Sequence, residues 1–417
     1  MSIHEQPAGK IRRLRWQETF AALKHYNYRL WFIGQVVSLV GTWMQSTAQG
    51  YLIYQITHSA AYLGLVGFVG GAPSLLFTLF GGVIADRLPR RTLLVITQTS
   101  MLILAFILAV LTFTNTVLPW HIIVLAFLLG VANAFDAPAR TSFVLELVDR
   151  ATMTNAIALN STMFNIATVV GPSVAGLTYA ALGPAWCFTL NGLSFIAVIG
   201  ALLLMRIKLD AQPARRAAAL EELGEGIRYV LKNRLIISLL ASIGMVSIFG
   251  IGMMNLLPAW ATDVLHGDVT TNGWLISARG FGSLVSALML AYWGNRKLRG
   301  RLWTYGAFVT PVMLFLFAWI RWLPLSLVTL LGVGWGTMMV TNNSQAIVQS
   351  LIPDALRGRV MGVYTLIFFG SMPIGSLLAG SVAQGIGEPL TVSLGAILLL
   401  VMALTVWMFM PEIRRQI

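Results

Sequence analysis

The sequence predicts an all-α membrane protein of twelve transmembrane helices in two six-helix halves. Hydrophobic residues make up 57% of the 417 residues, charged residues only 10%, and the mean hydropathy is +0.78. Soluble domains carry about a quarter charged residues. The apolar residues also fall into long segments, and the basic residues lie between these segments in alternate loops. Both features are typical of a chain that crosses a bilayer many times.

Twelve apolar segments follow one another along the chain. Each is long enough for a helix of about 20 residues, which crosses a hydrocarbon core of roughly 30 Å. Helices also satisfy their own backbone hydrogen bonds in lipid, where no water can do so. The segments are 28–54, 59–85, 92–113, 119–143, 152–181, 186–206, 235–262, 271–293, 302–320, 323–350, 358–385 and 389–410.

The basic residues predict the orientation. All but two of the 28 lysines and arginines lie near the termini or in alternate loops; the exceptions are Arg279, inside a segment, and Arg321, in an opposite loop. This one-sided placement puts both termini in the cytoplasm. The net charge of +13 therefore indicates contact with the lipid bilayer and no nucleic-acid partner. Residues 1–27 form a basic N-terminal cytoplasmic segment, in which Lys10 to Arg15 are expected to meet lipid headgroups.

The longest polar interval, 207–234, divides the chain into halves at 28–206 and 235–417. Apolar residues at 220, 223, 227, 230 and 231 predict an amphipathic helix in this cytoplasmic linker, on the membrane face. Two glycines of the fifth segment and one just after it also recur 204 residues later, in the eleventh segment and just after it. The pairs are Gly171 and Gly375, Gly176 and Gly380, and Gly183 and Gly387. The recurrence favours a duplicated architecture.

A charged hairpin, GVIADRLPRR, separates the second and third segments. Gly82 is followed four residues on by Asp86, then by Arg87, and after Pro89 by Arg90 and a second arginine. This pattern resembles the loop between helices 2 and 3 of the major facilitator superfamily, with proline where the family usually has glycine. A weaker copy, GNRKLRGR, occupies 294–301. The resemblance implies two halves that rock around a central path.

Two further stretches, AFDAPAR at 134–140 and RGRVMG at 357–362, are similar to signatures of bacterial enterobactin and macrolide exporters. That branch implies a secondary active transporter in the bacterial cytoplasmic (inner) membrane. It would export a small amphipathic molecule, either a siderophore-like metabolite or a macrolide-like drug, with proton antiport as the drive. The alternatives are an importer or a lysolipid flippase on the same fold, and a scaffold or sensor without a substrate. Nothing in the sequence indicates an oligomer, so we expect a monomer.

The resemblance also implies a cytoplasmic gate. Asp136 and Arg140 stand four residues apart and can pair on one helix. In similar transporters an acid at this position contacts the second-last base of the loop motif, here Arg90, while Asp86 faces the start of helix 11. The alternative is a topological anchor without a gating role. The expected gate residues are Gly82, Asp86, Arg87, Arg90, Asp136 and Arg140.

Polar residues at helical spacing mark a candidate substrate path. Those in the first segment fall within an arc of about 80° at about 100° per residue. Glutamines facing lipid would be costly, so the stripe faces a central path, or it forms hydrogen bonds between packed helices. Two amides in the tenth segment have a similar spacing and the same alternatives. The residues are Gln35, Ser38, Thr42, Gln45 and Gln49, and then Asn342 and Gln345.

Gly171, Pro172 and Gly176 are a remnant of the superfamily's antiporter signature, which implies a hinge. Small residues let helices approach closely and proline bends a helix, so simple packing is the alternative. Arg279 is costly inside a span unless it is paired or faces water. It is expected to meet an anionic substrate in the path or to pair with Asp263.

No nucleophile and base, metal-ligand spacing or phosphate loop accompanies these features, which argues against an enzyme, a cofactor or a metal. Cys187 is the single cysteine, so the chain has no intramolecular disulfide and no cysteine metal cluster.

Overall fold

The computed structural model describes residues 20–206, 219–293 and 298–414, and in this part of the chain every element is a helix. The N-terminal half follows a short turn, η1 (Ala21–Lys24), and is connected to the C-terminal half by the linker helix α8 (Ala219–Lys232). Its six helices are α2 (Tyr26–Thr57), α3 (Ala60–Arg87), α4 (Arg90–Phe113), α5 (Pro119–Glu146), α6 (Met153–Leu182) and α7 (Pro184–Leu204).

The C-terminal half begins with one irregular helix that runs from Arg234 to Val264. It is followed by α11 (Val269–Trp293), α12 (Arg299–Trp319), α13 (Leu323–Leu351), α14 (Arg357–Ile386), α15 (Glu388–Phe409) and the short α16 (Pro411–Arg414). Within the described residues, eleven helices have the length and hydropathy of a membrane span. The twelfth long helix is α2, which carries the polar stripe of the first segment.

The irregular helix consists of α9 (Arg234–Val246), η2 (Ser247–Ile251), η3 (Gly252–Leu256), α10 (Leu257–Ala259) and η4 (Trp260–Val264). Two sequence features explain its break from α-helical geometry. Gly252 lies against the backbone of Gly375 in α14, where an added Cβ would be 2.7 Å from the Cα of Gly375. Pro258 lacks a backbone N–H and cannot continue the hydrogen-bond ladder. The sequence pattern predicted a regular span here and missed this irregularity.

Short turns join the helices. Gly183 and Gly387 both have a positive φ, 92° and 83°, and each precedes a helix with proline at one of its first two positions. Only glycine adopts this backbone conformation without strain. The two turns stand at equivalent places in the two halves, which agrees with the duplicated architecture that the 204-residue recurrence favours.

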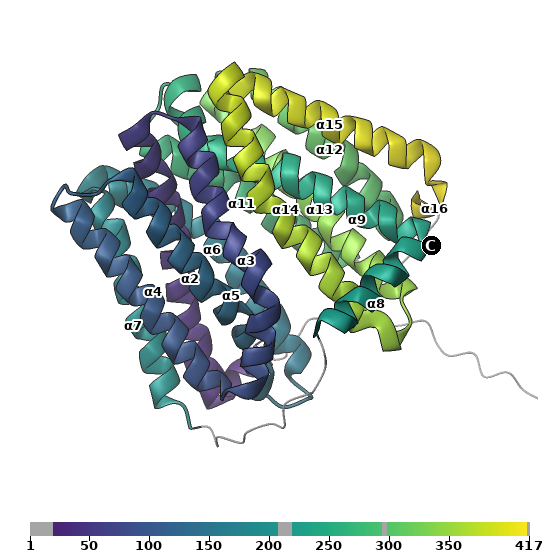
Figure 1. Cartoon of the computed structure of the whole chain (residues 1–417), viewed down its shortest axis with the longest axis horizontal. Coiled ribbons are helices and arrows are strands. Elements are labelled where there is room, and N and C mark those ends of the chain that lie inside the picture. Colours follow the sequence, from purple (N-terminus) through teal and green to yellow (C-terminus); the bar gives the residue numbers. More distant parts are fainter. Residues whose placement is uncertain (1–19, 207–218, 294–297, 415–417) are drawn as a thin grey trace, which may run out of the picture.

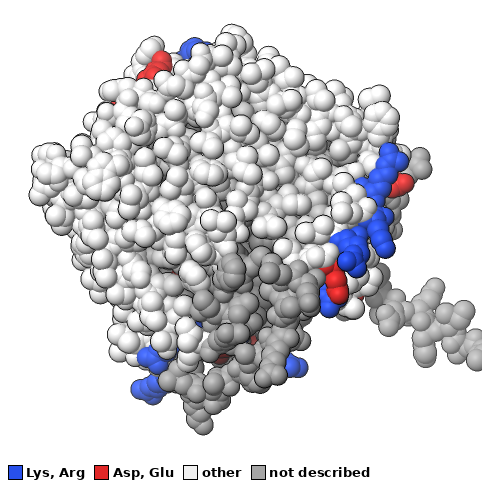
Figure 2. Space-filling view, viewed as in Figure 1, with Lys and Arg blue, Asp and Glu red and all other residues white. Residues whose placement is uncertain are grey.

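Most of the contact between the halves is made by two helix pairs, α3 with α14 and α6 with α11. The halves diverge from this junction towards the end that carries α8 (Figure 1). We call this the linker end, and the opposite end, which contains the turns at Gly183 and Gly387, the far end. Most of the visible surface is uncharged, and basic residues gather along the edge near α8 (Figure 2). A broad uncharged belt of this kind is what a bilayer requires.

Candidate functional site

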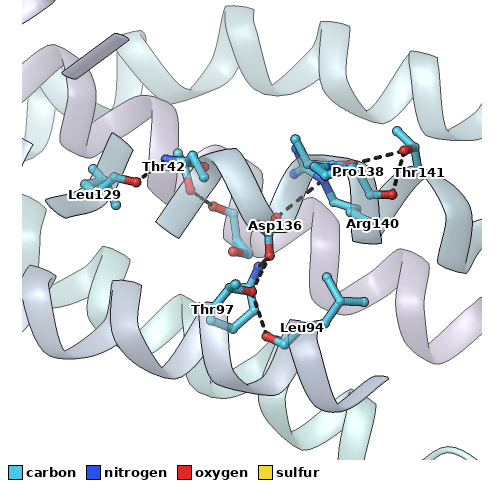
Figure 3. A network of polar contacts seen from close by, with 12 residues as sticks. Thr42, Leu94, Thr97, Leu129, Asp136, Pro138, Arg140 and Thr141 are labelled. Carbon is cyan, nitrogen blue, oxygen red and sulfur yellow. Dashed lines mark hydrogen bonds and ion pairs between the residues drawn. The ribbon is translucent and has the colours of Figure 1, made fainter. Parts of the chain in front are cut away.

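Asp136 of α5 is the centre of a buried polar network (Figure 3). The Thr97 hydroxyl and the Gln98 amide, both from α4, donate to its Oδ1 at 2.8 and 2.9 Å. Arg140 Nε lies 3.7 Å from its Oδ2. Only 1% of Asp136 is exposed, so these contacts replace the water that a carboxylate otherwise needs. The pairing of Asp136 with Arg140 agrees with their four-residue spacing.

Arg90 has a different partner from the one that the resemblance implied. It forms an ion pair with Glu146 at the end of α5, and not with Asp136. The reason is geometric, since Asp136 lies within the bundle whereas Arg90 and Glu146 lie near the linker end of adjacent helices. The pair joins α4 to α5 inside one half. Of the expected gate residues at the end of α3, the surroundings of Gly82 and the side chains of Asp86 and Arg87 lie outside the described part of the chain.

The polar stripe on α2 is largely buried within the N-terminal half. Gln35, Ser38, Gln45 and Gln49 are each at most 6% exposed, whereas Thr42 is half-buried. Gln45 accepts a hydrogen bond of 2.6 Å from the Asn191 amide of α7. This is the interhelical bonding that the sequence left as an alternative, and it makes Gln45 the weakest candidate for the path. The Nε2 of Gln35 is buried without a hydrogen-bond partner.

On α13, Asn342 and Gln345 are half-buried, while the neighbouring Asn343 and Ser344 are fully buried. Ser344 accepts a hydrogen bond from the indole nitrogen of Trp303 in α12. The helix therefore presents one face to α12 and a different, less buried face that carries Asn342 and Gln345. Their assignment to the substrate path stays a prediction.

The three expected hinge residues lie at helix contacts in α6. A Cβ on Gly176 would be 3.0 Å from the Cα of Thr270 in α11, across the junction of the halves. A Cβ added to Gly273, also in α11, would be 2.5 Å from the carbonyl oxygen of Pro172. Gly171 instead packs against the backbone of α2, near Met44. Two of the three residues thus form the α6–α11 contact, which small residues allow.

Polar contacts also cross between the halves, and no spacing in the sequence predicts them. The Tyr54 hydroxyl of α2 donates to the Asp263 carboxylate of η4. Ser59 donates to the Gln384 side chain of α14 at 2.7 Å. All side-chain hydrogen bonds found between the described parts of the two halves involve residues near the far end or in the far parts of α6 and α11. They are Tyr54 to Asp263, Ser59 and the Ala61 N–H to Gln384, Ser173 to Ser277, and Ser277 to the Val169 carbonyl.

The ion pairs near the linker end do not connect the two bundles in the described part of the chain. Arg359 at the start of α14 pairs with Glu225 of α8, and Arg357 pairs locally with Asp354. Gly226 of α8 lies against the Arg359 backbone, where a Cβ would be 2.6 Å from its carbonyl oxygen. The linker helix is therefore fixed to α14. Among the described residues, the halves are held together at the far end and are free of such contacts at the linker end.

Arg279 lies in α11 between the α6 and α13 contacts. It is half-buried, and its Nε has no hydrogen-bond partner. No ion pair joins it to a carboxylate among the described residues, and Asp263 instead accepts the Tyr54 hydroxyl. The alternative in which Asp263 neutralises Arg279 is therefore not observed in this conformation.

No group of three or more potential metal ligands gathers within the described residues. Cys187 is buried, and its thiol is directed to the Ala175 carbonyl of α6.

A comparison with known protein families identifies the family of this chain. A family of proteins described as transmembrane secretion effectors matches residues 17–415, nearly the whole chain. The chain belongs to this family. The match confirms the major facilitator resemblance and the efflux branch, and it confirms a membrane transporter rather than an enzyme.

Characterised relatives agree with this assignment. The chain is 28% identical to the multidrug efflux pump Tap of Mycolicibacterium fortuitum, over 87% of this chain and 90% of the pump. It is 26% identical to the enterobactin exporter EntS of Escherichia coli O1:K1 / APEC, over 96% of each chain. Among solved structures, the nucleoside transporter NupG has a TM-score of 0.70 at 16% identity, with 92% of this chain and 99% of that chain covered. The last likeness shows the fold.

Proposed function

We propose that this transmembrane secretion effector exports a small amphipathic molecule from the cytoplasm by alternating access, driven by proton entry. The observation that carries the proposal is the placement of the contacts between the halves. They lie at the far end and along the far parts of α6 and α11, whereas the halves diverge at the linker end (Figure 1). A transporter that is closed on one side and open on the other has this arrangement.

The linker end is cytoplasmic in this proposal. The alternate loops that carry the basic residues lead to the linker end, and the positive-inside rule then orients the molecule. In the proposed orientation, this conformation is the inward-facing state, in which substrate enters from the cytoplasm. Cysteines introduced at His58, Asn115 and Asp268 should react with an impermeant reagent added outside cells, and one at Arg215 should not. Reversed labelling would overturn the orientation.

The relatives support a small organic substrate, since one is named a multidrug efflux pump and the other an enterobactin exporter. In the proposed cycle, Asp86, Arg87 and the Asp136 network stabilise the outward-facing state on the cytoplasmic side. The Asp136 network supports this role by fixing the position of α5 against α4. The α6 glycines Gly171 and Gly176 and the intervening Pro172 serve as the hinge.

Accumulation measurements test the proposal. Cells with and without the protein are loaded with a panel of catecholate metabolites, macrolides and fluorescent dyes, and retention is followed over time. We expect lower retention of at least one compound in expressing cells, abolished by a protonophore. Higher retention would favour import, and an unchanged panel would favour a scaffold or sensor.

A further inference from the structure

Three faces of α11 can be assigned: two pack against neighbouring helices, and one is exposed. Gly273 and Gly280 lie against the α6 backbone, where a Cβ would be 2.5 and 2.6 Å from the carbonyl oxygens of Pro172 and Thr168. Gly282 lies against the α13 backbone at Leu331. A third face is largely exposed and apolar, with Trp274, Phe281 and Leu288. Successive residues are about 100° apart around a helix, which places this third face between the other two. Its exposed apolar side chains are suited to contact with lipid.

The fourth face of α11 points away from lipid and carries a polar stripe. Asn272, Arg279 and Ser286 stand seven residues apart, so each lies within about 20° of the next around the helix. Asn272 and Ser286 are at most 1% exposed. Each of the three has a buried side-chain nitrogen or oxygen without a hydrogen-bond partner: both amide atoms of Asn272, the Nε of Arg279 and the Oγ of Ser286. Buried polar atoms are otherwise almost always paired, so this row of polar atoms lacks its hydrogen-bond partners.

The charge of this face is positive and is not balanced by a described neighbour. Asp263 accepts the Tyr54 hydroxyl, and Asp268 accepts the backbone N–H and the hydroxyl of Thr271. Arg279 lies ten residues into α11, about 15 Å from its start at 1.5 Å per residue. A guanidinium at that depth is costly unless an anion or water meets it.

We propose that this face of α11 binds an organic anion, with Arg279 as the charged anchor for a carboxylate or phenolate. The inference rests on the export function proposed above and names the substrate class. The planar guanidinium can grip a carboxylate through two parallel hydrogen bonds. Asn272 and Ser286 are at most 1% exposed and flank Arg279 along the stripe, so the half-buried guanidinium is the group that a ligand reaches.

The first test measures the electrostatic field without a substrate. In a Cys187→Ala background, Ser283→Cys places a thiol one turn from Arg279, and its reaction rates with anionic sulfonatoethyl and cationic trimethylammonioethyl methanethiosulfonates are compared. We expect the anionic-to-cationic rate ratio to fall about tenfold in Arg279→Gln, and to fall likewise in wild type at 1 M salt. Thr154→Cys, at an exposed position in the distant first turn of α6, is the control, and its ratio should not change in Arg279→Gln.

The second test measures binding to the purified protein in nanodiscs, with 1-naphthoate and its neutral counterpart 1-naphthamide. We expect Arg279→Gln to weaken naphthoate binding about tenfold and to leave naphthamide within about twofold, with partial rescue by Arg279→Lys. Equal loss for both probes, no naphthoate binding by wild type, or an unchanged rate ratio would overturn the anion site. Protonophore-sensitive efflux of neutral dyes, if retained, would show that the export proposal stands even then.

Discussion

At the residue scale, Asp136 shows how a charged side chain is accommodated inside the N-terminal half. Two donors from α4 and one arginine from its own helix surround a carboxylate that is 1% exposed. Asp136 and Arg140 stand four residues apart on α5, and this spacing made their pairing predictable. The donors from Thr97 and Gln98 were not predictable, because sequence spacing relates residues on one helix and says nothing about which helix lies opposite.

Removing the Asp136 carboxylate should destabilise the fold. Asp136→Ala leaves Thr97, Gln98 and Arg140 without their acceptor in a buried site, and we expect a loss of about 3 kcal/mol. Thermal unfolding of the purified protein in detergent measures this. Glu146→Gln is the control. It removes the charge that pairs with Arg90 in a more exposed place than the Asp136 network, and it should cost less than about 1 kcal/mol. Equal shifts in the two variants would contradict the role given to the network.

Tyr54 should act as a latch at the far end. Tyr54→Phe removes the hydrogen bond to Asp263 while keeping the ring, and a hydrogen bond to a charged group contributes about 1.5–3 kcal/mol. The far end should therefore open more often, and the reactivity of a Ser277→Cys thiol towards an outside reagent should rise about tenfold. Tyr179→Phe is matched in chemistry but removes a hydroxyl that donates to Gln55 within the same half, and it should have no such effect.

At the scale of the elements, hydropathy predicted where the spans lie, because a bilayer selects length and composition. It did not predict the irregular helix from Arg234 to Val264. That break depends on Gly252 meeting Gly375 of a helix more than a hundred residues away, and a glycine in one segment does not reveal its partner. The same limit applies to Gln45, whose stripe was recognised but whose partner Asn191 was not.

The close α3–α14 contact should be sensitive to added bulk. A Cβ on Gly380 would lie 2.5 Å from the Ala60 carbonyl oxygen and 2.7 Å from the Gly64 Cα. Gly380→Val should therefore force the far end apart and reduce efflux severely, because the inward-facing state can no longer close there. Gly385→Val lies on the same helix with nothing within 4 Å of its Cβ, and it should transport normally. Normal efflux by Gly380→Val would show that this contact does not control the cycle.

At the scale of the whole molecule, the duplicated halves explain both the fold and its proposed movement. The 204-residue recurrence of glycines favoured a duplicated architecture, and Gly183 and Gly387 have the same unusual backbone conformation in the two halves. The contacts across the halves could not be predicted, since they depend on the conformation that the molecule adopts. Their concentration at the far end is what the proposed cycle requires of its inward-facing state.

Distances between spin labels across the halves test alternating access most directly. One pair, at Leu118 and Ile386, reports on the far end, and a second pair, at Arg150 and Lys232, reports on the linker end; all four residues are exposed. In the wild-type background we expect a narrow far-end distribution. In the Gly380→Val background the far-end distance should lengthen and the linker-end distance should shorten together. A linker-end distance that stays unchanged while the far end opens would contradict alternating access in this protein.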